Sequence, residues 1–251
     1  MKWSRVCSIF FLVVLVVLWE VLSRLQVYRE DFFPYLKTFI EATTHEISSG
    51  RLLVDLMASL YRWVCGFLLS ALVGIPVGLL LGRSESFRQF ISPYLNFFRS
   101  LSPLAWIPFA VIWFGIGDMP VIFLIFLGCV FPLLFATMNA VFHVPKVYDQ
   151  LARDYHFSGA EYFFEILFPA VLPQIVSSLR LVSGLAWIVL VPAEMLAGKE
   201  GVGFAISDAR NGMRTDLLVL NMIVIAVIAH FIDYGLQRLN RKSHVRWSYE
   251  Q

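Results

Sequence analysis

A few ionisable side chains lie inside long apolar stretches of this sequence, where they could carry a proton, an ion or a charged solute. Glu194 follows Pro192 near the end of one stretch, and His230 and Asp233 lie three residues apart in another. A charge at the centre of a membrane costs about 2.5–3.5 kcal/mol on insertion scales, so such a residue usually faces water, a partner or a path. We expect a path or gating role for Glu194, with an interfacial position as the alternative. His230 and Asp233 could share a metal ion or a proton, or simply form a hydrogen-bonded pair.

No catalytic constellation accompanies these residues. The sequence contains no HExxH, no GxSxG and no paired aspartates within an apolar run, so neither a zinc site nor an activated nucleophile is indicated. The glycine-rich GKEGVG at 198–203 lacks the GK[ST] ending of a nucleotide-binding loop. Cys7, Cys65 and Cys129 have no metal-binding spacing. We therefore predict that the chain is not an enzyme and holds no metal or cofactor of its own.

The apolar stretches that position these residues dominate the composition. Of 251 residues, 59% are hydrophobic and 15% are charged, with a mean hydropathy of +0.73. A membrane-spanning helix needs about 20 apolar residues, and the alternating pattern of barrel strands is absent. The sequence predicts an all-α, polytopic membrane protein that forms a single transmembrane domain over 1–251. Its six predicted spans are 8–24, 56–81, 94–116, 120–142, 171–197 and 217–237.

Basic residues indicate how the chain is oriented in the bilayer. With six spans, one side of the membrane receives Lys2, Arg5, Arg83, Arg88, Arg99, Lys146, Arg153, Arg238, Arg241, Lys242 and Arg246. The positive-inside rule makes this side cytoplasmic, together with both termini, although the opposite loops also carry basic residues. The first run lacks the small residues of a signal-peptide cleavage site, so we expect a retained helix. A net charge of +2 without a basic patch argues against a nucleic-acid partner.

Small residues and prolines mark the second and third predicted spans. A stripe of small residues recurs every four positions at Gly66, Ser70, Gly74, Gly78 and Gly82. Such a stripe lets another helix approach closely, either as static packing or as a sliding face. The third span is interrupted by prolines, so we expect a broken helix whose segment SPLAWIP (102–108) lies beside a cavity or a helix junction. On the outer side, LKTFIEATTHEI predicts an amphipathic surface helix, with a plain loop as the alternative.

The loop between the fourth and fifth spans is the most unusual part of the chain. DQLARDY has a helix-compatible composition, His156, Ser158 and Gly159 break the pattern, and AEYFFEILF begins a second amphipathic helix. We predict a helix, a turn and a second helix at the cytoplasmic membrane face. A short helix exposed there has little to bury unless a partner docks on it.

This loop resembles the cytoplasmic signature of binding-protein-dependent ABC importer permeases. That signature reads Glu-Ala-Ala, three residues, Gly, nine residues, then Ile-x-Leu-Pro, and its spacing matches Gln150 through Pro169, with identity at Ala152, Ile166 and Pro169. The segments SPLAWIPFAVIWFGIGDMPVIFLIFLG and LRLVSGLAWIVLVPAEMLAGKEGVGFAI are similar to the nitrate, sulfonate and taurine branch of the family. The similarity extends over about residues 50–240, which leaves helix 8–24 as an N-terminal addition.

The resemblance implies a permease subunit in the bacterial inner membrane. The expected partners are two cytoplasmic ATPase subunits that hold ATP and Mg²⁺, a second permease copy and an extracytoplasmic solute-binding protein. The residues expected to form the ATPase-coupling helix and its turn are Gln150, Leu151, Ala152, Arg153, Asp154, Tyr155, His156, Phe157, Ser158 and Gly159. His156 replaces the signature glycine, and His is among the non-glycine residues that tolerate positive φ.

The residues that contact the solute are predicted from placement alone. They are Ser102, Trp106, Trp187 and Glu194. The resemblance implies a small solute such as an oxyanion, a sulfonate or taurine. The competing hypothesis is a channel or an ion-coupled secondary transporter that needs no ATP, with Glu194, His230 and Asp233 as its ion or proton sites.

Overall fold

The structure is a computed structural model that describes residues 2–25 and 34–240, and helix is the only regular structure in those ranges. The elements are α1 (Lys2–Arg24), α2 (Leu36–Ser48), α3 (Arg51–Gly82), α4 (Glu85–Ser100), η1 (Pro103–Trp106), α5 (Ile107–Phe114), α6 (Asp118–Phe142), α7 (Lys146–Asp154), α8 (Gly159–Glu161), the π-helical η2 (Tyr162–Leu167), α9 (Phe168–Ala197), α10 (Val202–Asn211) and α11 (Thr215–Asn240). The predicted all-α fold is confirmed.

The long helices match most of the predicted membrane spans. Within the described ranges, four stretches are long and apolar enough to cross a membrane, and one bent pair of helices could form a fifth. The four are Arg51–Gly82, Asp118–Phe142, Gly159–Ala197 and Thr215–Arg238. The predicted span 8–24 lies in α1, which is not among them. The prediction of six spans is therefore not confirmed in number.

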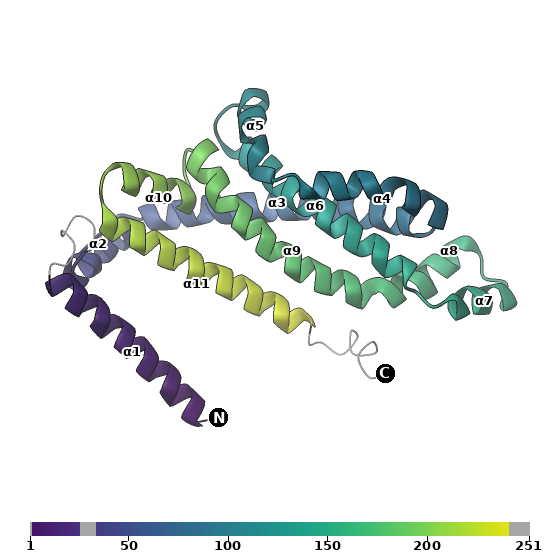
Figure 1. Ribbon diagram of the computed structural model, residues 1–251, viewed down its shortest axis with the longest axis horizontal. Coiled ribbons are helices and arrows are strands. Elements are labelled where there is room, and N and C mark those ends of the chain that lie inside the picture. The colour runs from purple at the N-terminus through teal and green to yellow at the C-terminus, as the bar shows by residue number, and fades with distance from the viewer. Residues whose placement is uncertain (1, 26–33, 241–251) are drawn as a thin grey trace.

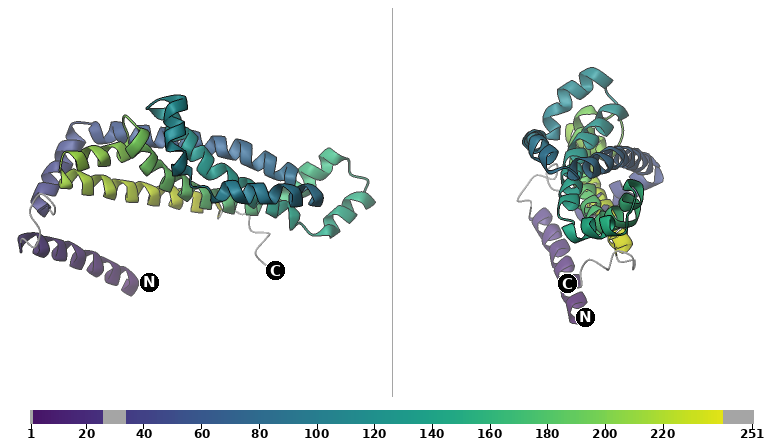
Figure 2. Two further views of the ribbon diagram at one scale, coloured as in Figure 1. Left: turned by 45° about the horizontal axis from the view of Figure 1, so that its top comes forward. Right: turned by 90° about the vertical axis from the view of Figure 1, so that its right-hand side faces the viewer.

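The centre of the molecule is formed by α3, α6 and α9, which pack against one another around buried side chains such as Leu124, Cys129 and Leu190 (Figure 1). Two ends can be distinguished. The α10 end carries α2 and α10, and the α7 end carries α7 and α8. Both views in Figure 2 show α1 standing apart from the bundle. The predicted amphipathic helix is confirmed as α2, and its Phe39 ring lies 5.9 Å from that of Trp19 in α1.

The small-residue stripe of α3 faces α6 along its whole length. All five of its members are buried. A Cβ atom added at Gly66 would lie 2.7 Å from the Ile125 side chain, and one at Gly82 would lie 2.6 Å from Val141. Ser70 uses its hydroxyl to donate to the Gly66 carbonyl at 2.7 Å. In this structure the stripe packs closely against α6.

Replacing Gly78 by alanine is expected to lower the free energy of unfolding by about 1–3 kcal/mol, the usual cost of overpacking. The added Cβ would lie 2.7 Å from Thr137 Cβ and 2.8 Å from the Leu134 carbonyl oxygen. Gly184 is the matched control, because it is also helical and an added Cβ meets nothing within 4 Å. Gly184→Ala should be neutral or stabilising, since alanine is the better helix former. Denaturant titration in mixed micelles measures both variants, and equal losses would contradict close α3–α6 packing.

The third predicted span is broken, as expected from its prolines. Helix α4 ends at Ser100, and the η1–α5 piece that follows is bent from it by 77°. The segment SPLAWIP forms the junction, with Ser102 exposed just before η1 and Trp106 half-buried at its end. The prediction of a helix junction at 102–108 is confirmed. The Trp106 ring lies 5.9 Å from Phe109 and 6.4 Å from Trp113, so an aromatic cluster covers one side of α5.

Candidate functional site

A buried ion pair joins α3 to α9 at the α10 end. The Arg62 guanidinium donates to a Glu194 carboxylate oxygen at 2.7 Å, with side chains only 2% and 0% exposed. The Ser59 hydroxyl donates to the same carboxylate at 2.8 Å, and the Gly203 amide donates to it at 2.9 Å. A second nitrogen of Arg62 donates to Asp118 at the start of α6, at 2.7 Å. These contacts meet the requirement that a buried charge be paired and hydrogen-bonded.

The glycine-rich loop 198–203 closes over Glu194, which explains a motif that fits no nucleotide-binding pattern. The Gly201 amide donates to Asp55 at 2.8 Å, and the next amide donates to the Ser59 hydroxyl at 2.9 Å. Gly201 has φ 112°, and a Cβ there would lie 2.5 Å from a Glu194 carboxylate oxygen. A Cβ at Gly203 would lie 2.5 Å from the Val191 carbonyl oxygen. Only glycine lets the backbone approach the carboxylate this closely.

Sequence reasoning missed most of this cluster. Asp55, Ser59 and Arg62 are spaced by four and three residues and therefore share one face of α3. The same spacing continues into Gly66, so the polar residues extend the small-residue stripe toward the α10 end. A charged Arg62 within an apolar run was the signal that could have identified the partner of Glu194.

The other ionisable residues pair differently from the prediction. Asp233 accepts two hydrogen bonds from the Arg180 guanidinium, at 2.8 and 3.0 Å. The predicted pairing of Asp233 with His230 is corrected by this ion pair between α9 and α11. Within the described residues, no group of three or more His, Cys, Asp or Glu side chains could hold a metal ion.

The four predicted path residues lie in different surroundings. Ser102 is exposed and Trp106 is half-buried at the α4–α5 junction. Trp187 is buried in the core, where its ring lies 6.5 Å from that of Trp63. Glu194 is enclosed by protein donors. The structure does not bring the four together into one site, so their contact with a solute stays a prediction.

The α7 end carries the predicted helix, turn and second helix. α7 ends at Asp154, and the Phe157 amide then donates to the Ala152 carbonyl at 2.9 Å while the His156 amide donates to Arg153 at 3.1 Å. This pattern is a Schellman motif. In this motif the residue after the helix C-cap has a left-handed backbone, and the amide of the next residue donates to the third-from-last carbonyl of the helix. His156 occupies the left-handed position with φ 55°, so the expected positive φ is confirmed.

The second helix begins with a capping box and continues into α9. The Ser158 hydroxyl accepts from the Glu161 amide at 3.3 Å, and the Glu161 carboxylate accepts from the Ser158 amide at 2.7 Å. These two bonds satisfy amides that the first helical turn leaves without partners. Leu167, at the end of the π-helical turn, is buried against α3 and α6 residues and anchors the segment to the bundle.

The turn segment presents two different faces. Ala152 is 7% exposed and faces the bundle. The outward face carries the exposed large side chains Val147, Tyr148, Leu151 and Tyr155. Gln150, Arg153, Asp154, Ser158 and Gly159 are also exposed, and Phe157 is half-buried. The outward side chains, rather than Ala152, are therefore the positions at which docking can be tested.

Replacing His156 by glycine is expected to leave solute uptake unchanged or slightly raised, because glycine adopts positive φ without steric cost. His156→Val is the contrasting variant, since a β-branched residue at positive φ is a genuine outlier. It should lower uptake, normalised to the amount of permease in the membrane. Loss of uptake in His156→Gly at a normal protein level would mean that the imidazole itself is needed.

Comparison with known proteins identifies the chain. Residues 74–245 match the family described as binding-protein-dependent transport system inner membrane component. The chain belongs to this family. It is the membrane-spanning permease subunit of an ABC importer, and such a subunit is a multi-pass inner-membrane component that is not itself catalytic. This result confirms the predicted family and supports the importer over the ATP-independent channel or secondary transporter.

Individual relatives agree with this assignment. The putative aliphatic sulfonates transport permease protein SsuC of Bacillus subtilis is 34% identical over 239 residues, which cover 94% of this permease and 86% of the relative. The taurine transport system permease protein TauC of Escherichia coli is 33% identical over 240 residues, covering 94% and 87%. An inward-facing structure of the MetNI methionine ABC transporter is similar in fold, with a TM-score of 0.70 and 18% identity over 78% of this chain and 97% of that one.

Proposed function

We propose that this permease imports a small oxyanion or sulfonate as a homodimer that works with two ATPase subunits and an extracytoplasmic solute-binding protein. The α7 end and both termini face the cytoplasm. ATP and Mg²⁺ are held by the ATPase subunits, and this chain holds no cofactor. The ATPase subunits grip the segment 150–159, so that their closure moves the membrane helices.

The main support for ATPase docking in this proposal is the outward face of α7. Val147, Tyr148, Leu151 and Tyr155 are large and exposed, although α7 is a short helix at the tip of the bundle (Figure 1). An exposed apolar patch of this kind on a helix marks an interaction surface. The Schellman motif and the capping box on either side of Phe157 fix the shape of the turn, which favours a docking element over a loose loop.

The cargo class is inferred from the relatives. The names of SsuC and TauC refer to aliphatic sulfonates and taurine, and both proteins align with nearly the whole chain. Ser102, Trp106, Trp187 and Glu194 remain our candidates for the solute path. Among them, Ser102 and Trp106 are the better placed to meet a solute, since they lie at the bent α4–α5 junction and are not enclosed in the core.

Co-purification with a partner tests the assignment. A tagged permease, expressed with its neighbouring genes, should bring an ATPase subunit through detergent extraction. In proteoliposomes that also contain the binding protein, uptake of a sulfonate should require ATP. The ATP should act only when it is supplied on the side of the membrane that the α7 end faces. Uptake that continues without ATP, driven by an ion gradient, would contradict the proposal and favour a secondary transporter.

A further inference from the structure

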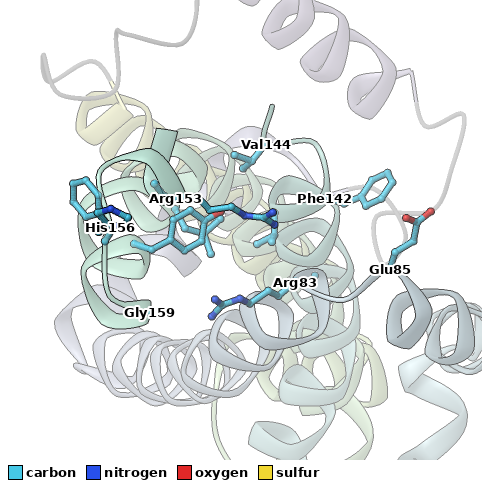
Figure 3. A pocket seen from close by; sticks show the side chains of 13 residues that line it. Arg83, Glu85, Phe142, Val144, Arg153, His156 and Gly159 are labelled. Atoms are coloured by element: carbon cyan, nitrogen blue, oxygen red, sulfur yellow. The ribbon is translucent and has the colours of Figure 1, made fainter. Parts of the chain in front are cut away.

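A cavity of about 710 Å³ lies behind the turn at the α7 end, between the turn and the ends of two membrane helices. Its walls include Gly82 at the end of α3 and the adjacent Arg83, Val141 near the end of α6, and Ala152 and Arg153 near the end of α7. Figure 3 shows this hollow from close by. The cavity lies on the bundle side of α7, because Ala152 lines it and is buried, whereas the docking face of α7 points the other way.

Two guanidinium groups from different parts of the chain point into this cavity. In Figure 3 the side chains of Arg83 and Arg153 extend into the hollow from opposite walls, and Glu85 lies at the edge, away from both. Among the side chains that the structure describes, which do not include that of Asp149, neither arginine forms an ion pair with a carboxylate. The contact of Arg83 is with a ring face, since its guanidinium carbon lies 5.6 Å from the centre of the Tyr162 ring. The hydrogen-bond donors of both groups are therefore available to a ligand.

The chemistry of the walls selects the class of ligand. Guanidinium groups present donors in a planar fork that matches the oxygens of a phosphate or a similar oxyanion. Both α3 and α6 end at this cavity, so it lies at the level where membrane helices meet the headgroup region. Basic pockets between transmembrane helices on the cytoplasmic side bind anionic lipid headgroups. A hydrophobic residue such as Leu167 on the wall suits a ligand that is charged at one end only.

We propose that this cavity is a binding site for a phosphate-type oxyanion held between Arg83, which directly follows α3, and Arg153 near the end of α7. The bound group bridges the end of a membrane helix and the segment that receives the ATPase, so that occupancy ties the turn to the bundle. The site rests on the proposed function only for the assignment of the α7 end to the cytoplasm. Its ligand is either the headgroup of an anionic phospholipid or a soluble phosphate-type ion.

Native mass spectrometry of the full-length permease, purified in a neutral detergent, tests the lipid source. Phosphatidylglycerol should be retained and phosphatidylcholine should not. Arg83→Gln should lower phosphatidylglycerol retention about fivefold, the effect of one basic residue near a membrane surface. Arg83→Lys should keep most of it. Arg238→Gln is the matched control, because Arg238 is a basic residue at the end of α11 that does not line the cavity, and it should leave retention unchanged.

Thermal unfolding of delipidated permease with inorganic phosphate or sulfate tests the soluble source. A stabilisation by millimolar phosphate that Arg83→Gln removes would support the oxyanion site with a soluble ligand. The proposal is overturned if Arg83→Gln changes neither lipid retention nor the response to phosphate. It is also overturned if Arg83→Gln weakens only the binding of the ATPase, since the cavity would then receive an acidic side chain of the partner protein. Both binding assays use the permease without the ATPase, so their failure leaves the importer assignment intact.

Discussion

Arg62→Met should lower the free energy of unfolding by about 3–5 kcal/mol, the cost of removing one partner from a buried ion pair. Methionine keeps much of the volume of arginine but leaves Glu194 buried without a cation. The carboxylate would retain only the Ser59 hydroxyl and the Gly203 amide as donors. Denaturant titration in mixed micelles, followed by intrinsic tryptophan fluorescence, measures the loss.

Arg51→Met is the matched control for this prediction. Arg51 also pairs with a carboxylate at 2.7 Å, that of Asp208, but the two side chains are 51% and 53% exposed. Exposed pairs contribute only about 0–1 kcal/mol, so this variant should change stability little. A double variant, Arg62→Met with Glu194→Leu, should recover part of the loss, because it leaves no unpaired charge. An effect of Arg62→Met as small as that of the control would mean that water reaches Glu194, which is what a role on the solute path requires.

Leu151→Asp should reduce ATP-driven uptake by at least about 30-fold, because a central apolar contact in an interface contributes 2 kcal/mol or more. Leu151 lies in the middle of the outward face of α7 and is 45% exposed, so the change places a charge on the proposed docking surface without disturbing the core. The fold should be unaffected. Uptake in proteoliposomes, solute-stimulated ATP hydrolysis and co-purification of the ATPase should all fall together.

Met213→Asp controls for the mere addition of an exposed negative charge. Met213 is 72% exposed between α10 and α11, at the end of the bundle opposite α7. Its φ of 53° suits aspartate, which tolerates the left-handed region. This variant should retain ATPase co-purification. Normal co-purification and coupling in Leu151→Asp would contradict the docking role of α7.

Local patterns in the sequence predicted the elements well. Helix-length apolar runs, prolines at 103 and 108 and the breaks at His156 and Ser158 each act through the backbone of a few neighbouring residues. The long helices, the bent α4–α5 pair and the turn at the α7 end could therefore be predicted from the sequence. The stripe from Gly66 to Gly82 predicted a close helix contact, but the periodicity could not name α6 as the partner.

Contacts between residues that are distant along the chain could not be predicted from the sequence in the same way. Arg62 and Glu194 are separated by 132 positions, and Arg180 and Asp233 by 53. A single sequence carries no direct signal for such pairs, so His230, which is close to Asp233 along the chain, was the natural but incorrect partner. The chain could still have indicated that Glu194 needed a cation, because an isolated buried carboxylate is too costly to persist.

The helical run from Gly159 to Ala197 has a mechanical consequence. Its 39 residues continue through the capping box and the π-helical turn without a break, which corresponds to a length of about 58 Å at 1.5 Å per residue. One end of this helical run adjoins the turn that follows α7, and the other holds the Glu194 carboxylate beneath the glycine loop. A tilt imposed at the α7 end is therefore expected to reach the α10 end through continuous hydrogen-bonded backbone, with bending at the π-helical turn and at Pro173 and Pro192.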